Sequence, residues 1–220
     1  MNNIKLIIFD LDGTVLDTLA DLAAALNFAL QKNGLPARRT DEVRAFVGNG
    51  IRKLIERGVP AGTNAATVDA VHRDFTRYYE AHCADATAPY PGARETLAAL
   101  RGAGYKTAVV SNKADYAVQK LAETYFPGDF DYVTGEREGV RRKPAPDTAL
   151  AALKALNVSA GEALFVGDSE VDIETARNAG MPCVSVTWGF KDRDFLIAHG
   201  AETLIDRPLE LAQRMNCVMK

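Results

Sequence analysis

Short apolar segments alternate with amphipathic segments along most of the chain. Residues 5–9 form an isoleucine-rich run that is followed at once by acidic residues, as is typical of a strand buried in a parallel sheet. Strands separated by helical patterns predict an α/β fold, a doubly wound parallel sheet with crossover helices. Further strands are expected at residues 106–111, 132–134, 163–166, 183–186 and 203–205.

Helical patterns fill the segments between these strands. Helices are expected at residues 91–102 and 146–156, with Pro146 suited to a first helical turn. Another is expected at residues 170–179, where Gly180 is a candidate C-cap. Residues 208–220 predict a last amphipathic helix.

Residues 17–87 break this alternation, because they contain no convincing strand and read as amphipathic helices. One helix is expected before Gly34, and a second over residues 68–82. We therefore predict a helical domain at 17–87 inserted into an α/β core domain of residues 1–16 and 88–220, with linkers near 15–18 and 84–89. The apolar positions are Leu19, Leu22, Ala23, Leu26 and Leu30 in the first helix, and Val71, Phe75 and Tyr78 in the second.

The bulk composition excludes several classes of protein. The 220 residues are 47% hydrophobic and 25% charged with a net charge of −3, which is ordinary for a globular protein and gives no footprint for nucleic acid or a membrane surface. The three cysteines lack the spacing of a disulfide framework or zinc site. No apolar run approaches a membrane span, so a cytoplasmic location is expected. The sequence makes no prediction of the oligomeric state.

Polar side chains gather where the predicted strands end. Each has an ordinary alternative: aspartates there are common turn residues, Asp172 could complement a helix dipole, and a loop lysine is usually solvated. Together, three carboxylates in one crevice without histidine or cysteine indicate a hard cation such as Mg²⁺, and a lysine and a hydroxyl suit a phosphoryl group. The residues are Asp10, Asp12, Ser111, Asn112, Lys143 and Asp168.

Four ordered segments carry a family resemblance. They are DLDGT at residues 10–14, SN at 111–112, KPAP at 143–146 and GDSEVD at 167–172. In this order they resemble the motifs of the haloacid dehalogenase superfamily, and the helical insertion is similar to that superfamily's type 1 cap. The resemblance implies a Rossmann-like core and an enzyme that transfers phosphoryl groups.

The resemblance also implies roles in catalysis. Asp10 would be the nucleophile that becomes an aspartyl phosphate, and Asp12 would be the general acid and then the general base. Lys143 would orient Asp10 and offset charge.

Binding roles follow from the same resemblance. Ser111, Asn112 and Thr14 would bind the substrate, the first two through phosphoryl oxygens. Mg²⁺ would be held by Asp10, the main-chain carbonyl of Asp12, and Asp168, with Asp172 supporting the metal.

Several residues bear on the reaction. Dehalogenases and phosphonate hydrolases of the superfamily lack an aspartate at the position of Asp12, and its mutases carry a histidine where Leu22 stands. All three classes are therefore disfavoured. Residues 17–22, 47–57 and 188–190 are similar to segments of phosphoglycolate phosphatases, which predicts a small phosphorylated metabolite as substrate.

The cap residues Asn49, Arg52 and Lys53 are expected to contact an anionic leaving group, with a solvated helix face as the alternative. A pyrophosphatase, or a broad phosphatase for sugar phosphates and nucleotides, would use the same core chemistry. A phospho-accepting signalling module is disfavoured because Gly135 and Glu136, not an aspartate, follow the third strand.

Overall fold

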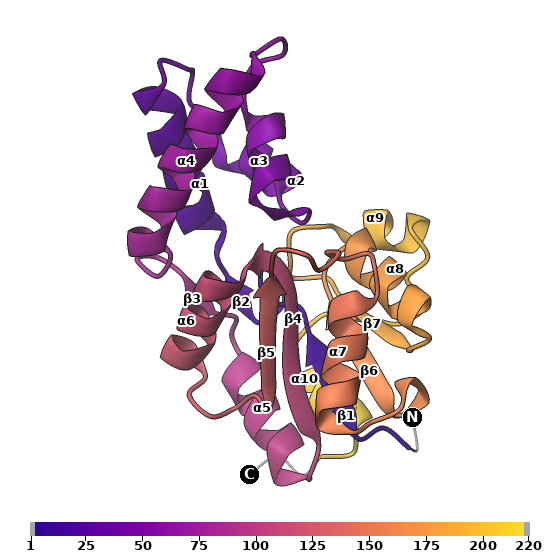
Figure 1. Ribbon diagram of the computed structural model, residues 1–220. Coiled ribbons are helices and arrows are strands. Elements are labelled where there is room, and N and C mark those ends of the chain that lie inside the picture. Colours follow the sequence, from indigo (N-terminus) through magenta and orange to yellow (C-terminus); the bar gives the residue numbers. More distant parts are fainter. Residues whose placement is uncertain (1–2, 218–220) are drawn as a thin grey trace.

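The computed structural model describes residues 3–217 and contains a six-stranded sheet with helices on both faces (Figure 1). The strand order is β5-β4-β1-β6-β7-β8, and every neighbouring pair is parallel. The fold is thus the predicted doubly wound α/β type. The strands are β1 (Leu6–Phe9), β4 (Lys106–Ala114), β5 (Tyr132–Glu136), β6 (Ala163–Gly167), β7 (Cys183–Val186) and β8 (Leu204–Ile205).

Alternate residues of β1 enter two separate hydrophobic cores, because successive side chains of a strand point to opposite faces. Leu6 and Ile8 pack on the face covered by α7 (Asp147–Leu156) and α8 (Glu170–Ala179). Ile7 and Phe9 belong to the core of the other face. That core includes side chains from α5 (Ala93–Gly102), α6 (Asp115–Tyr125) and α10 (Leu209–Arg214).

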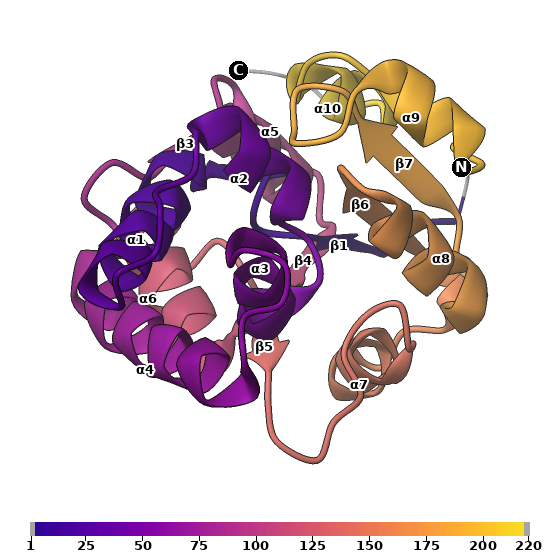
Figure 2. The ribbon, with the colours of Figure 1, turned by 90° about the horizontal axis from the view of Figure 1, so that it is seen from above.

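Four helices form a layer beyond one end of the sheet (Figure 1). The helices are α1 (Leu19–Lys32), α2 (Thr40–Phe46), α3 (Gly50–Gly58) and α4 (Ala65–His82). Seen from above, one of these helices, α3, lies beside β4 while α1 and α4 lie farther from it (Figure 2), and α3 and β4 are in contact. A short helix, α9 (Arg193–Ala198), follows β7.

The chain enters and leaves the helical layer through a two-stranded antiparallel ribbon, β2 (Leu16–Asp17) and β3 (Ala88–Pro89). The buried carboxylate of Asp21, in the first turn of α1, accepts hydrogen bonds from the amides of Ala86 and Thr87 at 2.9 and 2.8 Å. It also accepts one from the Thr87 hydroxyl at 2.7 Å. These bonds hold the two connections side by side where the sequence predicted linkers without strands.

The predicted strands are all present, and β4 continues through Ser111 and Asn112 beyond its predicted end. Two details differ. Pro146 is the residue before α7, not part of its first turn, because its ψ of 0° is not helical. In α4 the buried aromatic side chains are Phe75 and Tyr79, whereas Tyr78 is half-buried against Phe28. The predicted helix at 208–220 ends at Arg214 as α10, and residues 218–220 lie outside the described part of the chain.

Candidate active site

Asp10 stands at the point where the strand order reverses. It follows β1 directly, between β4 on one side and β6 on the other, and its amide donates to the Val166 carbonyl at 2.9 Å. From β1 the chain runs outward to β5 on one side and later to β8 on the other, and ligands of open α/β sheets bind at such a reversal. The sheet therefore places Asp10 where a ligand is expected.

Three buried carboxylates meet at this point. Asp10, Asp168 and Asp172 each offer an oxygen, and the three oxygens lie within 4.8 Å of one another. Gly13 and Gly167 make this proximity possible, because a Cβ on Gly13 would lie 2.3 Å from Asp168 Oδ2 and one on Gly167 would lie 2.3 Å from Asp172 Cβ. Gly13 also has a φ of +83°, in the left-handed region that glycine tolerates.

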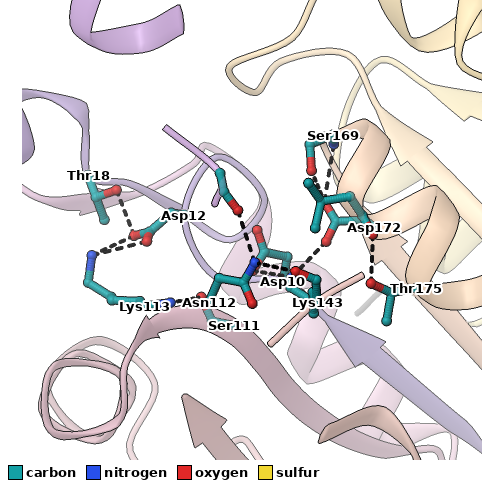
Figure 3. A network of polar contacts seen from close by, with 12 residues as sticks. Asp10, Asp12, Thr18, Ser111, Asn112, Lys113, Lys143, Ser169, Asp172 and Thr175 are labelled. Carbon is teal, nitrogen blue, oxygen red and sulfur yellow. Dashed lines mark hydrogen bonds and ion pairs between the residues drawn. The ribbon is translucent and has the colours of Figure 1, made fainter. Parts of the chain in front are cut away.

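Lys143 joins two of these acids (Figure 3). Its Nζ lies 2.9 Å from Asp10 Oδ1 and 2.7 Å from Asp172 Oδ1, and its side chain is buried. The other oxygen of Asp172 accepts hydrogen bonds from the amide and hydroxyl of Ser169, at 3.1 and 2.7 Å. Asp168 Oδ2 accepts from the Phe190 amide at 2.6 Å. Fixed donors therefore orient all three carboxylates.

Burial and mutual repulsion disturb the titration of this cluster. Desolvation raises the pKa of Asp10 to about 7, opposed by the charge of Lys143 and reinforced by those of Asp172 and Asp12. Desolvation, followed by the charges of Asp172 and Asp10, also raises the pKa of Asp168 well above its usual range. The nearby carboxylates outweigh desolvation at Lys143 and raise its pKa, so Lys143 stays charged.

The donor set fits a divalent cation. The site holds four acidic and two basic side chains, so two negative charges remain uncompensated when all six are ionised. The acids are Asp10, Asp12, Asp168 and Asp172, and the bases are Lys143 and Lys113. Carboxylate oxygens are the ligands that hard cations prefer. A divalent cation would balance the remaining charge and would lower the raised pKa values.

Asp12 belongs to a separate pair. Its carboxylate accepts a hydrogen bond from the Thr18 hydroxyl at 2.7 Å and faces the Nζ of Lys113, which lies 2.8 Å from Oδ1 and 3.1 Å from Oδ2 (Figure 3). Lys113 is buried, and the charge of Asp12 outweighs desolvation and raises its pKa. Lys113 was not among the site residues predicted from the sequence. The available signal was its spacing, because Lys113 lies two residues after Ser111 in the same strand.

A cavity lies between the sheet and the helical layer. Its sheet side includes Ser111 and Asn112, as predicted for substrate-binding residues, and Asn112 Nδ2 donates to the carbonyls of Gly48 and Lys143 at 3.1 and 3.0 Å. The helical side is mostly apolar. It is lined by Leu22, Val47, Gly48, Gly50, Ile51, Leu54 and Tyr79.

Two of the residues predicted to contact the leaving group, Arg52 and Lys53, do not face the cavity in this structure. Arg52 turns away from the cavity and pairs with Glu56 at 3.0 Å and Asp69 at 2.5 Å. Lys53 also pairs with Glu56, at 2.7 Å. Neither lines the cavity, because α3 directs Ile51 and Leu54 inward and these basic residues to solvent.

Two further predicted substrate-binding residues are also not brought to the cavity wall. The side chain of Asn49 accepts a hydrogen bond from Arg57 at 2.7 Å. Thr14 is buried beneath the site, where its carbonyl accepts from Trp188 Nε1 at 3.0 Å. Gly48 and Gly50 line the cavity where the prediction placed Asn49.

The fold and the strand-end carboxylates define a class of hydrolase. Residues 7–186 match the sequence profile of the haloacid dehalogenase-like hydrolases, and the chain belongs to this family.

Individual relatives share most of the chain's length. A phosphoglycolate phosphatase of Pseudomonas putida is 34% identical over 209 residues, which is 92% of this chain and 76% of that protein. One of Aquifex aeolicus is 32% identical over 213 residues, 96% and 97% of the two chains. The crystal structure of a predicted phosphoglycolate phosphatase from Haemophilus somnus superposes with a TM-score of 0.91 at 30% identity, over 98% of this chain and 99% of that one.

Proposed function

We propose that the chain is a Mg²⁺-dependent phosphatase that hydrolyses the monoester of 2-phosphoglycolate through an aspartyl phosphate. The observation that carries the proposal is the buried group of Asp10, Asp168 and Asp172 with Lys143, at the edge of the sheet where a ligand binds. The named activity of the Pseudomonas and Aquifex relatives supports the substrate.

The first step is a transfer to Asp10. Its carboxylate attacks phosphorus, an O–P bond forms to Asp10, and the bond from phosphorus to the leaving oxygen breaks. Asp12 donates a proton to the leaving oxygen, so the alcohol departs neutral at that atom. Lys143 holds Asp10 at 2.9 Å and favours its ionised form, which is the nucleophile.

The second step returns the enzyme to its starting state. Asp12 takes a proton from water, the water oxygen attacks phosphorus, and the bond to Asp10 breaks to release inorganic phosphate. Ser111 and Asn112 line the cavity and would donate to the phosphoryl oxygens. Asp10, Asp168 and the Asp12 carbonyl would hold Mg²⁺, with Asp172 in support through Lys143. When bound, Mg²⁺ would offset the negative charge that gathers on those oxygens.

The helical layer would act as a cap. We propose residues 17–87 as a cap domain over the core of residues 1–16 and 88–220, because α3 lines the cavity and its apolar side chains Ile51 and Leu54 would exclude water. A cytoplasmic location is part of the proposal. Within residues 3–217, the helices are too short or too polar to cross a membrane.

The test is phosphate release from 2-phosphoglycolate with Mg²⁺, beside glucose phosphates, pyrophosphate and a nucleoside monophosphate. The Asp10→Asn protein is the blank, and we expect it to lose at least about 10⁴-fold in kcat. A kcat/KM for phosphoglycolate well above the others supports the proposal. Preference for another ester, with activity that still needs Asp10, would support the mechanism and contradict the assigned substrate. Release of only about one phosphate per chain would contradict the proposal that the protein is an enzyme.

A further inference from the structure

Two polar groups beside the cavity are not accounted for by the chemistry at phosphorus. Lys113 is buried on the cavity wall, and its Nζ lies 4.7 Å from the centre of the Tyr79 ring. Tyr79, from α4, lines the same cavity, and its buried hydroxyl has no hydrogen-bond partner within residues 3–217. A buried hydroxyl without a partner is destabilising, so such a group in a native protein calls for an explanation.

The position of Lys113 is set by Asp12. Asp12 lies within 2.8 Å of Lys113 Nζ and, in the proposed function, gives its proton to the leaving oxygen. In 2-phosphoglycolate one methylene joins that oxygen to the carboxylate. The carboxylate of the leaving group must therefore lie close to Asp12, and once Asp12 has given up its proton the two groups are neighbouring anions that need a cation between them.

Other basic residues fit this place less well. Arg52 and Lys53 are paired with acids on the outer face of α3. Lys143 pairs with Asp10 and Asp172 beneath the phosphoryl site. Lys191 lines the cavity, but its Nζ lies 3.4 Å from the Ala45 carbonyl and 5.4 Å from the Phe195 ring centre. Lys113 is thus the basic residue that adjoins both Asp12 and the cavity.

We propose that Lys113 and Tyr79 form the subsite for the carboxylate of the leaving group, with the Lys113 ammonium and the Tyr79 hydroxyl as its donors. This inference rests on the proposed function and names the class of substrate, phosphate esters of short hydroxy acids. Because Tyr79 comes from α4 in the helical layer and Lys113 from β4, the subsite is complete only when Tyr79 is held beside Lys113 as it is here. Binding of the carboxylate would then favour the arrangement in which the helical layer covers the cavity.

The test compares two esters with the same two-carbon backbone. 2-Phosphoglycolate carries the carboxylate, and 2-hydroxyethyl phosphate carries a neutral hydroxymethyl group in its place. The ratio of their kcat/KM values measures recognition of the carboxylate, and any damage to Asp12 cancels because both reactions need it. We expect Lys113→Met to lower this ratio by about 30-fold or more, as removal of a buried charged partner does.

Tyr79→Phe is the second variant, because Lys113→Met leaves Asp12 without its partner and could weaken the fold. Phenylalanine keeps the ring beneath Lys113, and the lost hydroxyl made no hydrogen bond, so we expect unchanged thermal unfolding. The ratio should fall about tenfold, mainly through the KM for phosphoglycolate. Lys120→Met is the matched control, since exposed Lys120 also joins the core to α4, through the Glu80 carbonyl at 3.1 Å, and should leave the ratio unchanged.

The outcomes separate this inference from the substrate assignment. A wild-type preference for phosphoglycolate that falls in Lys113→Met and Tyr79→Phe but not in Lys120→Met supports the subsite. A wild-type preference that survives both substitutions overturns the subsite and leaves the proposed function intact. Equal hydrolysis of the two esters by the wild-type protein overturns the assigned substrate and the subsite together.

Discussion

The two walls of the cavity differ in whether their charged side chains are buried or exposed. On the sheet side, the charged residues are buried or, for Asp12, partly buried, and each is paired or hydrogen-bonded; they are Asp10, Asp12, Asp168, Lys113 and Lys143. On the helical side the inward-facing residues are mainly apolar, and the charged residues of α3 pair with one another in solvent. The comparison indicates that the core supplies the reactive charges and the helices supply shape and exclusion of water.

The difference has a physical cause. A buried charge is tolerated only where partners are held at hydrogen-bonding distance, since its desolvation is otherwise too unfavourable. The ends of neighbouring parallel strands fix such distances, and the glycines at positions 13 and 167 let the acidic side chains approach the backbone. A helix packed across the sheet through apolar contacts can move as a body without leaving a buried charge unpaired. Catalytic charges therefore gather on the rigid wall.

Removal of Lys143 should have the largest effect, because it leaves Asp10 and Asp172 without their shared cation. We expect Lys143→Met to lower kcat for phosphoglycolate by about 10³-fold or more, as loss of a group that holds the nucleophile does. Metal-free unfolding free energy at pH 8 should fall by about 3 to 5 kcal/mol, as when a buried pair is broken. Urea titration and phosphate release measure the two effects.

The matched control for this variant is Lys106→Met. Lys106 lies at the exposed start of β4, where its Nζ donates to the Leu156 carbonyl at 2.7 Å. It should change kcat little. Equal losses in the two variants would show that Lys143 acts through general stability and would remove the distinction between the reactive wall and the rest of the core.

The sequence predicted the sheet side far better than the helical side. Apolar runs followed by acidic residues predicted the strands and the positions of Asp10 and Asp168, because ligands of a parallel sheet bind at one edge of it. Lys113 was missed because a lysine at the end of a strand usually points to solvent, whereas here Asp12 and Tyr79 pack against its buried side chain. The neighbours Tyr78 and Tyr79 are both compatible with the helical period. Their burial depends on how α4 packs against α1 and the sheet, which the period does not specify.

Binding of Mg²⁺ should depend steeply on pH. Asp10 has a pKa of about 7 in the folded, metal-free protein against an ordinary value of 3.8, so this carboxyl stabilises the fold below pH 4 and the contribution is lost as the pH rises through 7. Mg²⁺ must displace the proton, so its affinity should rise at least about tenfold per pH unit up to pH 7, and displacement of a proton from Asp168 adds to this slope. Calorimetric titration between pH 5.5 and 8.5 measures this slope.

The Asp10→Asn protein is the control for that slope, since it lacks the proton that Mg²⁺ displaces from this position. Its affinity should be weaker and less dependent on pH, with the remaining slope due to Asp168, whose pKa is also raised by burial. An affinity that is independent of pH in the wild-type protein would contradict the prediction, because it would show that the cluster binds no proton in this range.

The smallest effect is expected at Arg52, and the prediction compares Arg52 with Ile51, its neighbour in α3. Arg52 points to solvent and pairs with Glu56 and Asp69, whereas Ile51 lines the cavity. Arg52→Ala should leave kcat/KM for phosphoglycolate within about twofold of the wild type, as for most exposed substitutions. Ile51→Ala should raise KM by about three- to tenfold, because it removes apolar surface that covers the bound substrate. A KM that rises in Arg52→Ala for phosphoglycolate but not for 2-hydroxyethyl phosphate would show that α3 turns Arg52 inward when substrate binds. The helical wall would then contribute a charge of its own, and the contrast between the two walls would hold only for the protein without substrate.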